Sequence, residues 1–219
     1  RNKRNRNTLF VMVIDSRNAV YTDSHFQKLP GFLQPSDVLV LNDTRVLPAR
    51  LYGKLERKSG ASRTVEVLFA APVPGRADQI ADQGGQTWEV LCRPGKHVRP
   101  GDRVTFGAGA CVGVFGESRE YGLRALRLDL SEPIENVMER YGRIPLPPYI
   151  GRSDTEVDAT EYQTVFARKP GAIAAPTAGL HFTEAMFRAL CAYGIQVETI
   201  TLHVGVGTFI PIRSENPEE

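Results

Sequence analysis

Apolar and polar positions divide the chain into three stretches, and the first contains two short apolar runs. Residues 8–15 (TLFVMVID) and 37–41 (DVLVL) are rich in Val and Leu and are bounded by polar residues. Runs of this length and composition predict buried β-strands. Between them, residues 25–33 (HFQKLPGFL) contain Pro30 and Gly31, which predict a connector with a short, broken helix at most.

The middle stretch, from about residue 49 to residue 130, consists of short β-type runs separated by turns. The candidate strands are residues 50–55, 64–70, 87–92, 102–106, 111–115 and 123–128. Pro-Gly pairs at residues 94–95 and 100–101 are turn signals, and residues 72–86 have the composition of a loop. Six strands over this span, without an amphipathic helix of ordinary length, predict a small β-barrel or sandwich.

Helix signals return after residue 130. Ser131 is placed to cap a first helix that ends at Gly142, and Thr183 is placed to cap a second that ends at Gly194. The buried face of the second helix is expected to contain Met186, Phe187, Leu190 and Cys191. Residues 195–203 (IQVETITLH) then alternate as a strand.

This order of elements predicts an α/β fold interrupted by an all-β segment. Helices and strands occur together at both ends of the chain, with only strands between them. We therefore expect a discontinuous α/β domain, formed by residues 1–49 and 131–219, with an inserted β-barrel-like domain at residues 50–130.

Composition narrows the class of protein. With 219 residues, of which 42% are hydrophobic, the chain is long enough for one or two domains, and its formal net charge of +2 attracts polyanions only weakly. The three cysteines are far apart and form no CxxC pair, and the four histidines lack the spacing of a metal site. No apolar run is long enough for a membrane span. We expect a cytoplasmic monomer with no metal, no permanently bound cofactor and no membrane association.

Two local clusters of positive charge are candidates for contact with phosphates. One is the N-terminal run of residues 1–6, and the other lies within residues 93–103. From the second cluster we select Arg93, Lys96 and Arg99 as the candidate RNA-binding residues. The alternative for each cluster is an ordinary solvated surface.

Three polar or glycine-rich segments are candidates for the chemistry. In the first, Asn42, Asp43 and Arg45 follow the predicted strand 37–41 directly. Because the carboxyl ends of strands in an α/β sheet line the ligand site, these side chains are suited to sugar hydroxyls and a carboxylate. The alternative is an Asx-type turn with an ion pair from Asp43 to Arg45.

The second segment is residues 174–183 (AAPTAGLHFT), which leads into the helix capped by Thr183. Small residues such as Gly179 let a backbone approach a ligand closely, and a helix start offers free amide donors to which Thr177 adds a hydroxyl. His181 would then lie beside the ligand. The alternative is a histidine that only packs near the helix start.

The third segment is residues 202–209 (LHVGVGTF), in which His203 and Thr208 flank Gly205 and Gly207. It is a candidate for a second wall of the same site, with a satisfied buried histidine as the alternative. A lone GxG is a weak signal, and neither a GxGxxG fingerprint nor a P-loop is present. Aromatic residues at positions 149, 162 and 166 are candidates for stacking on a base, although core packing is the default for Phe166.

Five segments together resemble the tRNA ribosyltransferase-isomerase family of queuosine synthesis. In chain order they are LNDTRVLPARL (41–51), WEVLCRPGK (88–96), GRIPLPPYI (142–150), EYQTVFARKPGAIAAPTAGLHFT (161–183) and TLHVGVGTFIPIR (201–213). The last two are long and specific. The resemblance also implies that the chain is partial, since family members have a further strand before Arg1 and a further segment beyond Arg213.

The resemblance implies a reaction as well as an α/β domain with an inserted barrel. The ribosyl part of S-adenosylmethionine, a co-substrate, is transferred to 7-aminomethyl-7-deazaguanine at the wobble position of a tRNA. There it is isomerised to give epoxyqueuosine, and adenine and methionine are released. Proton abstraction at C5′ needs a general base, and departure of adenine needs an acid or donor.

We assign residues to these tasks as hypotheses. The catalytic candidates are Asp43, His181 and His203. The substrate-binding candidates are Asn42, Arg45, Tyr162, Thr177, Gly179, Gly205, Gly207 and Thr208, with Arg45 opposite the methionine carboxylate. The alternatives to this enzyme are a non-catalytic RNA-binding β-barrel module and an inactive truncated remnant.

Overall fold

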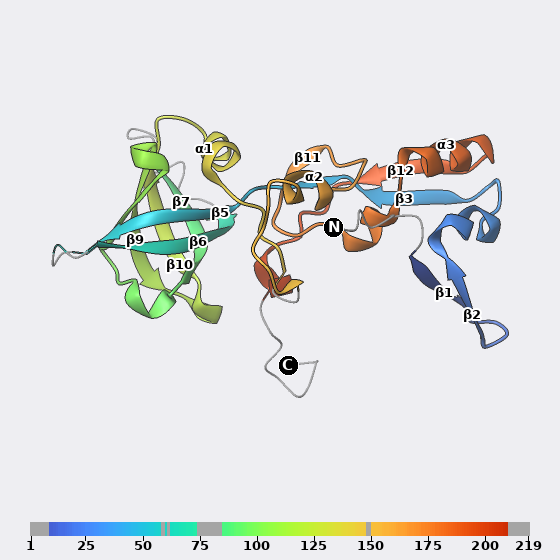
Figure 1. Ribbon diagram of the computed structural model, residues 1–219, viewed down its shortest axis with the longest axis horizontal. Coiled ribbons are helices and arrows are strands. Elements are labelled where there is room, and N and C mark those ends of the chain that lie inside the picture. The colour runs from blue at the N-terminus through green and yellow to red at the C-terminus, as the bar shows by residue number, and fades with distance from the viewer. Residues whose placement is uncertain (1–8, 58–59, 61, 74–84, 148–149, 210–219) are drawn as a thin grey trace.

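The computed structural model describes residues 9–57, 60, 62–73, 85–147 and 150–209 (Figure 1). The molecule is elongated, with a β-barrel at one end and three two-stranded sheets toward the other. The fold is therefore of mixed α/β content, with a closed barrel and parallel strand pairs.

The barrel is formed by six antiparallel strands in the order β10-β7-β6-β5-β8-β9. Their bounds are β5 (Arg50–Glu56), β6 (Ser62–Pro72), β7 (Gly85–Arg93), β8 (Arg103–Phe106), β9 (Cys111–Ser118) and β10 (Arg124–Asp129). Short 3-10 helices join them: η4 (Gly95–His97), η5 (Gly107–Gly109) and η6 (Glu120–Gly122). The prediction of a barrel or sandwich is confirmed as a closed barrel, which leaves no free strand edge.

Alternation along the strands fills the barrel with apolar side chains. Leu51 and Leu55 on β5 point inward, and the rings of Phe69, Phe106 and Phe115 are fully buried. Gly53 lies between the two leucines on the same inward face, where a Cβ would come within 2.5 Å of a Val104 methyl carbon. Close packing of this kind is what fixes the register of the strands.

Helix α1 (Ile134–Tyr141) covers the barrel and belongs to its core, since Ile134, Val137 and Met138 are fully buried in the same cluster. Gly142 ends the helix as predicted. The prediction that Ser131 caps it is wrong: the N-cap residue is Pro133, and no side chain caps the helix start.

The other end of the molecule is built from three strand pairs. β1 (Phe10–Asp15) and β2 (Val20–His25) form an antiparallel hairpin, followed by the 3-10 helix η2 (Phe26–Phe32). β3 (Val38–Asn42) pairs in parallel with β12 (Gln196–Ile200), and β4 (Thr44–Val46) pairs in parallel with β11 (Lys169–Ala172). Segments from both ends of the chain therefore lie side by side (Figure 1).

The strands at residues 8–15 and 37–41 form, but the prediction that they are buried is wrong. On β1, Phe10 is 81% exposed and Met12 and Ile14 are more than half exposed. On β3, Val38 and Val40 are also more than half exposed. The exposed residues of each strand alternate with more buried ones, so one face of each strand pair has no covering layer among the described residues.

Helix α3 (Glu184–Ala192) confirms the second predicted helix. The Thr183 hydroxyl accepts a hydrogen bond of 3.3 Å from the Met186 amide, as an N-cap should. Met186 and Leu190 are buried and Phe187 is half-buried, but Cys191 is exposed, contrary to the prediction. Among the described residues, no helix has the length and apolar character needed to cross a bilayer.

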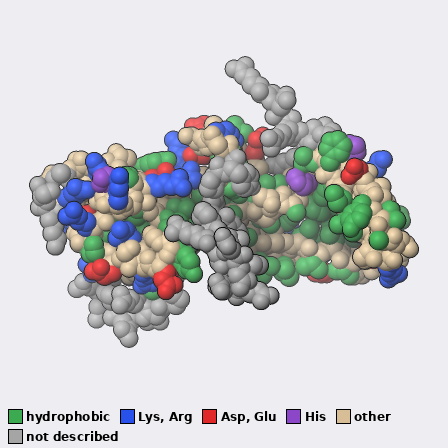
Figure 2. Space-filling model, turned by 90° about the horizontal axis from the view of Figure 1, so that it is seen from below, with side chains coloured by type: hydrophobic (Ala, Val, Ile, Leu, Met, Phe, Trp, Pro, Cys, Tyr) green, Lys and Arg blue, Asp and Glu red, His purple; other side chains and the backbone are tan. Residues whose placement is uncertain are grey.

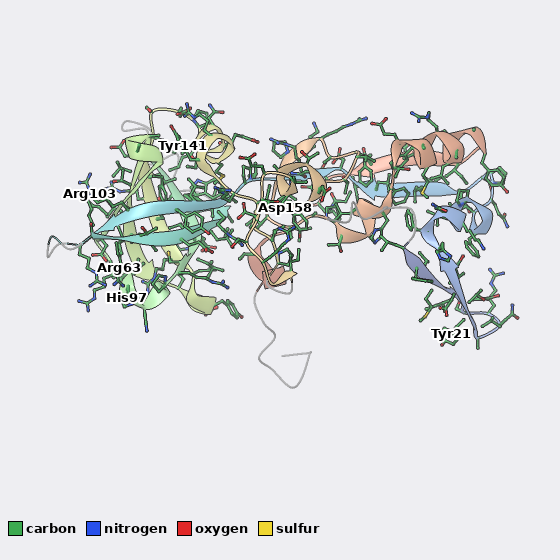
Figure 3. All side chains as sticks on the ribbon, in the orientation of Figure 1. Tyr21, Arg63, His97, Arg103, Tyr141 and Asp158 are labelled. Carbon is green, nitrogen blue, oxygen red and sulfur yellow. The ribbon has the colours of Figure 1, made fainter. Side chains whose placement is uncertain are left out.

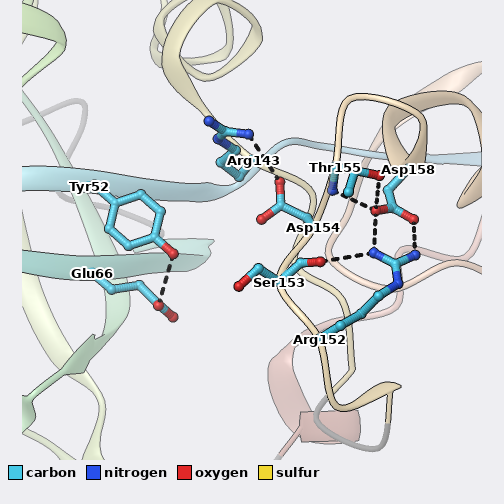
Figure 4. Close-up of polar contacts among 8 residues, drawn as sticks. All are labelled: Tyr52, Glu66, Arg143, Arg152, Ser153, Asp154, Thr155 and Asp158. Atoms are coloured by element: carbon cyan, nitrogen blue, oxygen red, sulfur yellow. Dashed lines mark hydrogen bonds and ion pairs between the residues drawn. The ribbon is translucent and has the colours of Figure 1, made fainter.

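Between α1 and α2 (Asp158–Glu161), the chain is fixed by the Asp158 carboxylate (Figure 4). It accepts two hydrogen bonds of 2.7 Å from the Arg152 guanidinium and two more from the Thr155 amide and hydroxyl. The bonds from Arg152 lower the pKa of Asp158 to about 2, helped by those from Thr155 and opposed by burial. Arg143 lies 3.8 Å from the carboxylate of Asp154 in the same segment.

Candidate functional site

Asp43 lies where the two parallel strand pairs meet. It separates β3 from β4, and its amide donates to the Ile200 carbonyl at the end of β12 (2.9 Å). Its carbonyl accepts hydrogen bonds from the amides of Arg168 (2.7 Å) and Lys169 (3.1 Å), where β11 begins. Backbone hydrogen bonds from both neighbouring strands therefore fix the position of this residue.

The Asp43 side chain is buried but not isolated. It is 5% exposed, and one carboxylate oxygen accepts a 2.7 Å hydrogen bond from the Thr201 hydroxyl, directly after β12. A buried carboxylate needs such a partner, because desolvation disfavours its charged form. The residues at the ends of β3 and β12 thus place one acidic group and one hydroxyl in contact.

His203 is joined to the same junction through Thr44. The Thr44 hydroxyl is 2.8 Å from His203 Nδ1, and Thr44 itself is 1% exposed while His203 is exposed. On β11, Gly171 lies against the imidazole, since a Cβ there would be 2.6–2.8 Å from three ring atoms. The structure thus brings segments 41–45 and 202–209 into contact through Thr44 and His203, and their forming one site stays a prediction.

The side-chain amide of Asn42 forms hydrogen bonds with other residues of the protein. Its Nδ2 donates to the Leu202 carbonyl (2.8 Å), while its Oδ1 accepts from the amides of Leu202 (3.0 Å) and Thr44 (3.1 Å). These bonds fasten the end of β3 to the segment after β12. Asn42 therefore acts as an Asx-type link, which is the alternative that the sequence left open for this segment.

Arg45 pairs with α1. Its Nη2 is 2.6 Å from Glu139 Oε1, and both side chains are more than one-third exposed. The ion pair that the sequence suggested, from Asp43 to Arg45, is not the one that forms among the described residues. Arg45 instead links β4 to the helix that covers the barrel.

The second segment forms the 3-10 helix η8 (Thr177–His181) before α3 begins. Thr177 is exposed, but Gly179 is buried, and a Cβ there would be 2.9 Å from Phe166 Cζ. Packing alone therefore accounts for this glycine. The ring of His181 is partly exposed and meets the Phe26 ring edge-on, with centroids 5.5 Å apart.

The GxG segment forms the 3-10 helix η9 (Val206–Phe209). Gly205 and Gly207 are exposed, and an added Cβ at either would meet no atom of the described residues within 4 Å. Packing thus does not account for these two glycines. The side chain of Thr208 lies outside the described part of the structure.

The aromatic candidates behave as core residues. Tyr162 is buried in a cluster with Val46, Ile144 and Leu146, so the prediction that it is exposed for stacking on a base is wrong. Phe166 packs edge-on against two other phenylalanine rings, in agreement with the default expectation. Residue 149 lies outside the described residues.

The three candidate RNA-binding residues lie at one end of the barrel, where further cations join them. Arg93 ends β7, Lys96 lies in η4 and Arg99 follows it, and all three are exposed. Figure 2 shows Lys and Arg side chains around a histidine over this part of the molecule, and Figure 3 places Arg63, His97 and Arg103 there. We call Arg57, Arg63, Arg93, Lys96, His97, Arg99 and Arg103 the cationic barrel end.

The electrostatic effect of the cationic barrel end is visible at His97. Desolvation and then the positive charges of Arg63, Lys96 and Arg57 lower the pKa of His97. Arg57 also donates a 3.0 Å hydrogen bond to the His97 carbonyl. The N-terminal cluster, residues 1–6, lies outside the described residues.

The sequence alone did not single out Thr44, Gly171 and Thr201. Thr44 and Thr201 stand beside chosen residues, but threonine is an ordinary strand residue and gave no separate signal. Gly171 follows Pro170 and could be taken for a turn residue. Within the described ranges, no group of three or more His, Cys, Asp and Glu side chains is placed to hold a metal ion.

Comparisons with known proteins all point to one family. The sequence model of the queuosine biosynthesis protein family matches residues 1–219. An S-adenosylmethionine:tRNA ribosyltransferase-isomerase from Halothermothrix orenii is 40% identical over 98% of this chain and 59% of its own length. One from Symbiobacterium thermophilum is 43% identical over 95% of this chain and 57% of its own length. The chain thus spans less than three-fifths of the length of these two relatives.

A solved structure is also similar in sequence. The S-adenosylmethionine tRNA ribosyltransferase of Thermotoga maritima is 25% identical, and the match covers 92% of this chain and 52% of that one. The TM-score is 0.33, which is too low to compare the two folds.

Proposed function

This chain belongs to the queuosine biosynthesis protein family, and we propose that it takes part in S-adenosylmethionine:tRNA ribosyltransferase-isomerase chemistry. The ribosyl group of S-adenosylmethionine is transferred to 7-aminomethyl-7-deazaguanine at the wobble position of tRNA and isomerised. The products are epoxyqueuosine-tRNA, adenine and methionine. S-adenosylmethionine is a co-substrate in this proposal, and no permanently bound cofactor takes part.

One observation carries the proposal: an acid and an imidazole are held at the same strand junction. The Asp43 carboxylate accepts from Thr201, two residues before His203, and His203 in turn contacts Thr44, the residue after Asp43. Abstraction of a proton beside a sulfonium needs a base of this kind. We assign that role to His203, because a neutral imidazole has a ring nitrogen that can accept a proton.

The remaining site residues have secondary roles in the proposal. Asp43 binds ribose hydroxyls or is the alternative base, and His181 assists the departure of adenine. Gly205 and Gly207, whose small size packing does not explain, let the backbone approach the substrate. Arg45 releases Glu139 and binds the methionine carboxylate in its place. This exchange is feasible because a solvent-exposed ion pair is weak.

The proposal includes a domain arrangement. Residues 1–49 and 131–219 form a discontinuous α/β domain that carries the site, and residues 50–130 form the inserted barrel, whose core α1 completes from the other domain. The pairing of β3 with β12 and of β4 with β11 supports this division. The barrel then has the task of binding tRNA phosphates through Arg93, Lys96 and Arg99, because the cationic barrel end concentrates positive charge.

The decisive experiment is adenine release from S-adenosylmethionine by the full-length protein, measured by chromatography. We expect release only with tRNA that carries 7-aminomethyl-7-deazaguanine, and its loss in Asp43→Asn and His203→Gln. His25→Gln, on the β2 strand, is the matched control and should keep full activity.

A second candidate function is a non-catalytic RNA-binding barrel module, which the cationic barrel end favours. A module of this kind binds the same tRNA but releases no adenine. Its RNA affinity should tolerate both Asp43→Asn and His203→Gln. Tight RNA binding without release, from a folded full-length protein, would replace the enzyme proposal with this one.

A further inference from the structure

Three features of the strand junction converge on the His203 ring. Thr44 comes from β4, Gly171 from β11, and His203 from the segment after β12. The first two strands pair with each other, with Lys169 opposite Thr44. The ring is therefore held by two residues from one rigid strand pair.

Gly171 lies at an irregularity of that pair. The register of β11 on β4 shifts between Pro170 and Ala172, so Gly171 is the inserted residue of a bulge. Its φ of +149° lies in a region that favours glycine. A Cβ on this backbone would be 2.6 Å from His203 Cε1, 2.7 Å from Nε2 and 2.8 Å from Nδ1. The nearly equal distances mean that the glycine packs over the side of the ring that carries both nitrogens.

Thr44 fixes the rotation of the His203 ring about its side-chain bonds. The buried Thr44 hydroxyl is 2.8 Å from Nδ1, and the Thr44 amide is itself held by Asn42 (3.1 Å). Among the described residues, Nε2 has no hydrogen-bond partner. One ring nitrogen is thus held by the protein, and the other is left for a ligand.

We infer that Thr44 and Gly171 are positioning residues that hold His203 in one orientation, with Nδ1 bound to Thr44 and Nε2 presented to the substrate. This inference rests on the proposed function only in giving Nε2 a reaction to serve. The Thr44 hydroxyl can accept from Nδ1–H or donate to an unprotonated Nδ1, so the contact fixes the orientation of the ring. A base at Nε2 requires the first arrangement, in which Nδ1 carries the proton and donates to Thr44. The bulge at Gly171 provides the space without which the ring could not take this position.

The first test is the ¹⁵N NMR spectrum of the His203 imidazole, identified by its loss in His203→Gln. We expect the tautomer with the proton on Nδ1 to dominate in the native protein, and dominance of the Nε2–H tautomer would exclude Nε2 as the base. Thr44→Val has nearly the same shape but lacks the hydroxyl, and it should return the ring toward the mixture of free imidazole. Thr44→Ser should keep the native spectrum. A Thr44→Val spectrum that matches the native one overturns the inference.

The second test measures thermal stability, so it requires neither an NMR spectrum nor the catalysed reaction. Gly171→Ala should lower the Tm by about 4 °C more in the native background than in His203→Ala, because only the native background contains the clashing ring. Gly109→Ala is the matched control: its φ of +105° is also positive, but an added Cβ has no described atom within 4 Å. Equal losses of Tm in both backgrounds would show that Gly171 does not position the ring.

Kinetics then separates this inference from the proposed function. If His203 is the base, Thr44→Val lowers kcat for adenine release by about tenfold or more with little change in KM, and Thr44→Ser restores it. Thr105→Val, on barrel strand β8, should change neither. If His203→Gln is fully active while the tautomer still depends on Thr44, the catalytic role of His203 fails but the positioning of its ring stands.

Discussion

The barrel and the strand pairs at the other end of the molecule use similar sequence patterns to different effect. On β5 the inward residues Leu51 and Leu55 are fully buried, because the barrel closes around them. On β1 the side chains of Phe10, Met12 and Ile14 are exposed, because no described element packs on that face of the hairpin. An apolar strand pattern therefore specifies a strand, but closure or a covering layer decides whether its side chains leave water.

The difference matters for function because the candidate site lies in the open region. In the closed barrel each strand forms hydrogen bonds with two neighbouring strands. The barrel can therefore have charged loops on its surface. The strand junction instead holds Asp43, Thr44 and His203 by hydrogen bonds between short strands. If the proposed site is correct, stability and chemistry are concentrated in different parts of the chain, and substitutions should separate them.

The largest expected effect compares two phenylalanines. Phe115→Ala in the barrel, where the side chain is 1% exposed, should lower the free energy of unfolding by about 3–5 kcal/mol. Phe10→Ala on β1, where it is 81% exposed, should change it by less than about 0.5 kcal/mol. Denaturant unfolding of both variants measures this. A large loss in Phe10→Ala would mean that the β1 face is covered in solution.

The next effect concerns the segment between the two regions. Asp158→Asn removes the negative charge and one of the two oxygens that accept from Arg152 and Thr155, and it should cost about 1–2 kcal/mol at neutral pH. The pKa of Asp158 falls from 3.8 to about 2 on folding. At about 1.4 kcal/mol per pKa unit the shift amounts to a little over 2 kcal/mol, which we reduce because Arg152 is half exposed.

The pH dependence of that loss follows from the sign of the shift. A carboxylate with a lowered pKa in the folded state stabilises the protein above the unfolded pKa of 3.8, and the stabilisation is lost as the pH falls toward 2. The native protein and Asp158→Asn should therefore converge in stability between pH 4 and pH 2. Asp154→Asn, whose ion pair with Arg143 spans 3.8 Å, is the matched control and should lose less. A constant difference down to pH 2 would contradict this account.

Most of the barrel could be predicted from the sequence, and the reason is local. Its strands alternate between inward and outward residues and end at turn signals such as Pro94-Gly95, so each strand is specified by its own residues. Burial of β1 and β3 could not be predicted, because it depends on whether another part of the structure covers each face of the sheet. The N-cap of α1 is Pro133 rather than Ser131, a difference of two residues that is common at helix ends.

The site could be predicted in part. Segments 41–45 and 202–209, both chosen from the sequence, are in contact through Thr44 and His203 at the ends of parallel strands. The partners of Arg45 and Tyr162 depend on α1 and on the cluster around Val46, which are distant in sequence. Gly171 lies at a register shift between β11 and β4, and no pattern of residues in the sequence predicts such a shift.

A smaller effect is expected at the ion pair that joins the two regions. Glu139→Gln frees Arg45 and should change the free energy of unfolding by less than about 1 kcal/mol, because both side chains are partly exposed. If Arg45 binds the methionine carboxylate, the same variant should lower the KM for S-adenosylmethionine, and Arg45→Gln should raise it. Steady-state kinetics of adenine release measures both. An unchanged KM in the two variants would exclude Arg45 from the substrate site.

The smallest expected effect is a pKa change at the cationic barrel end. Desolvation and the charges of Arg63, Lys96 and Arg57 lower the pKa of His97, since they disfavour the imidazolium. RNA phosphates bound at this surface would offset the cations, so the pKa of His97 should rise when tRNA is added. By linkage, tRNA should bind more tightly as the pH falls through the His97 pKa.

An NMR titration of the histidine ring protons, with and without tRNA at low salt, measures the shift at His97. His25, on β2 at the opposite end of the molecule, is the internal control and should not change (Figure 1). Raising the salt concentration should abolish the effect together with binding, because phosphate contacts release counterions. If tRNA binds while the pKa of His97 stays constant, the phosphates lie elsewhere. The barrel would then be a stable scaffold without a role in RNA recognition. The proposal that the barrel binds tRNA while the strand junction carries out the chemistry would lose its first part.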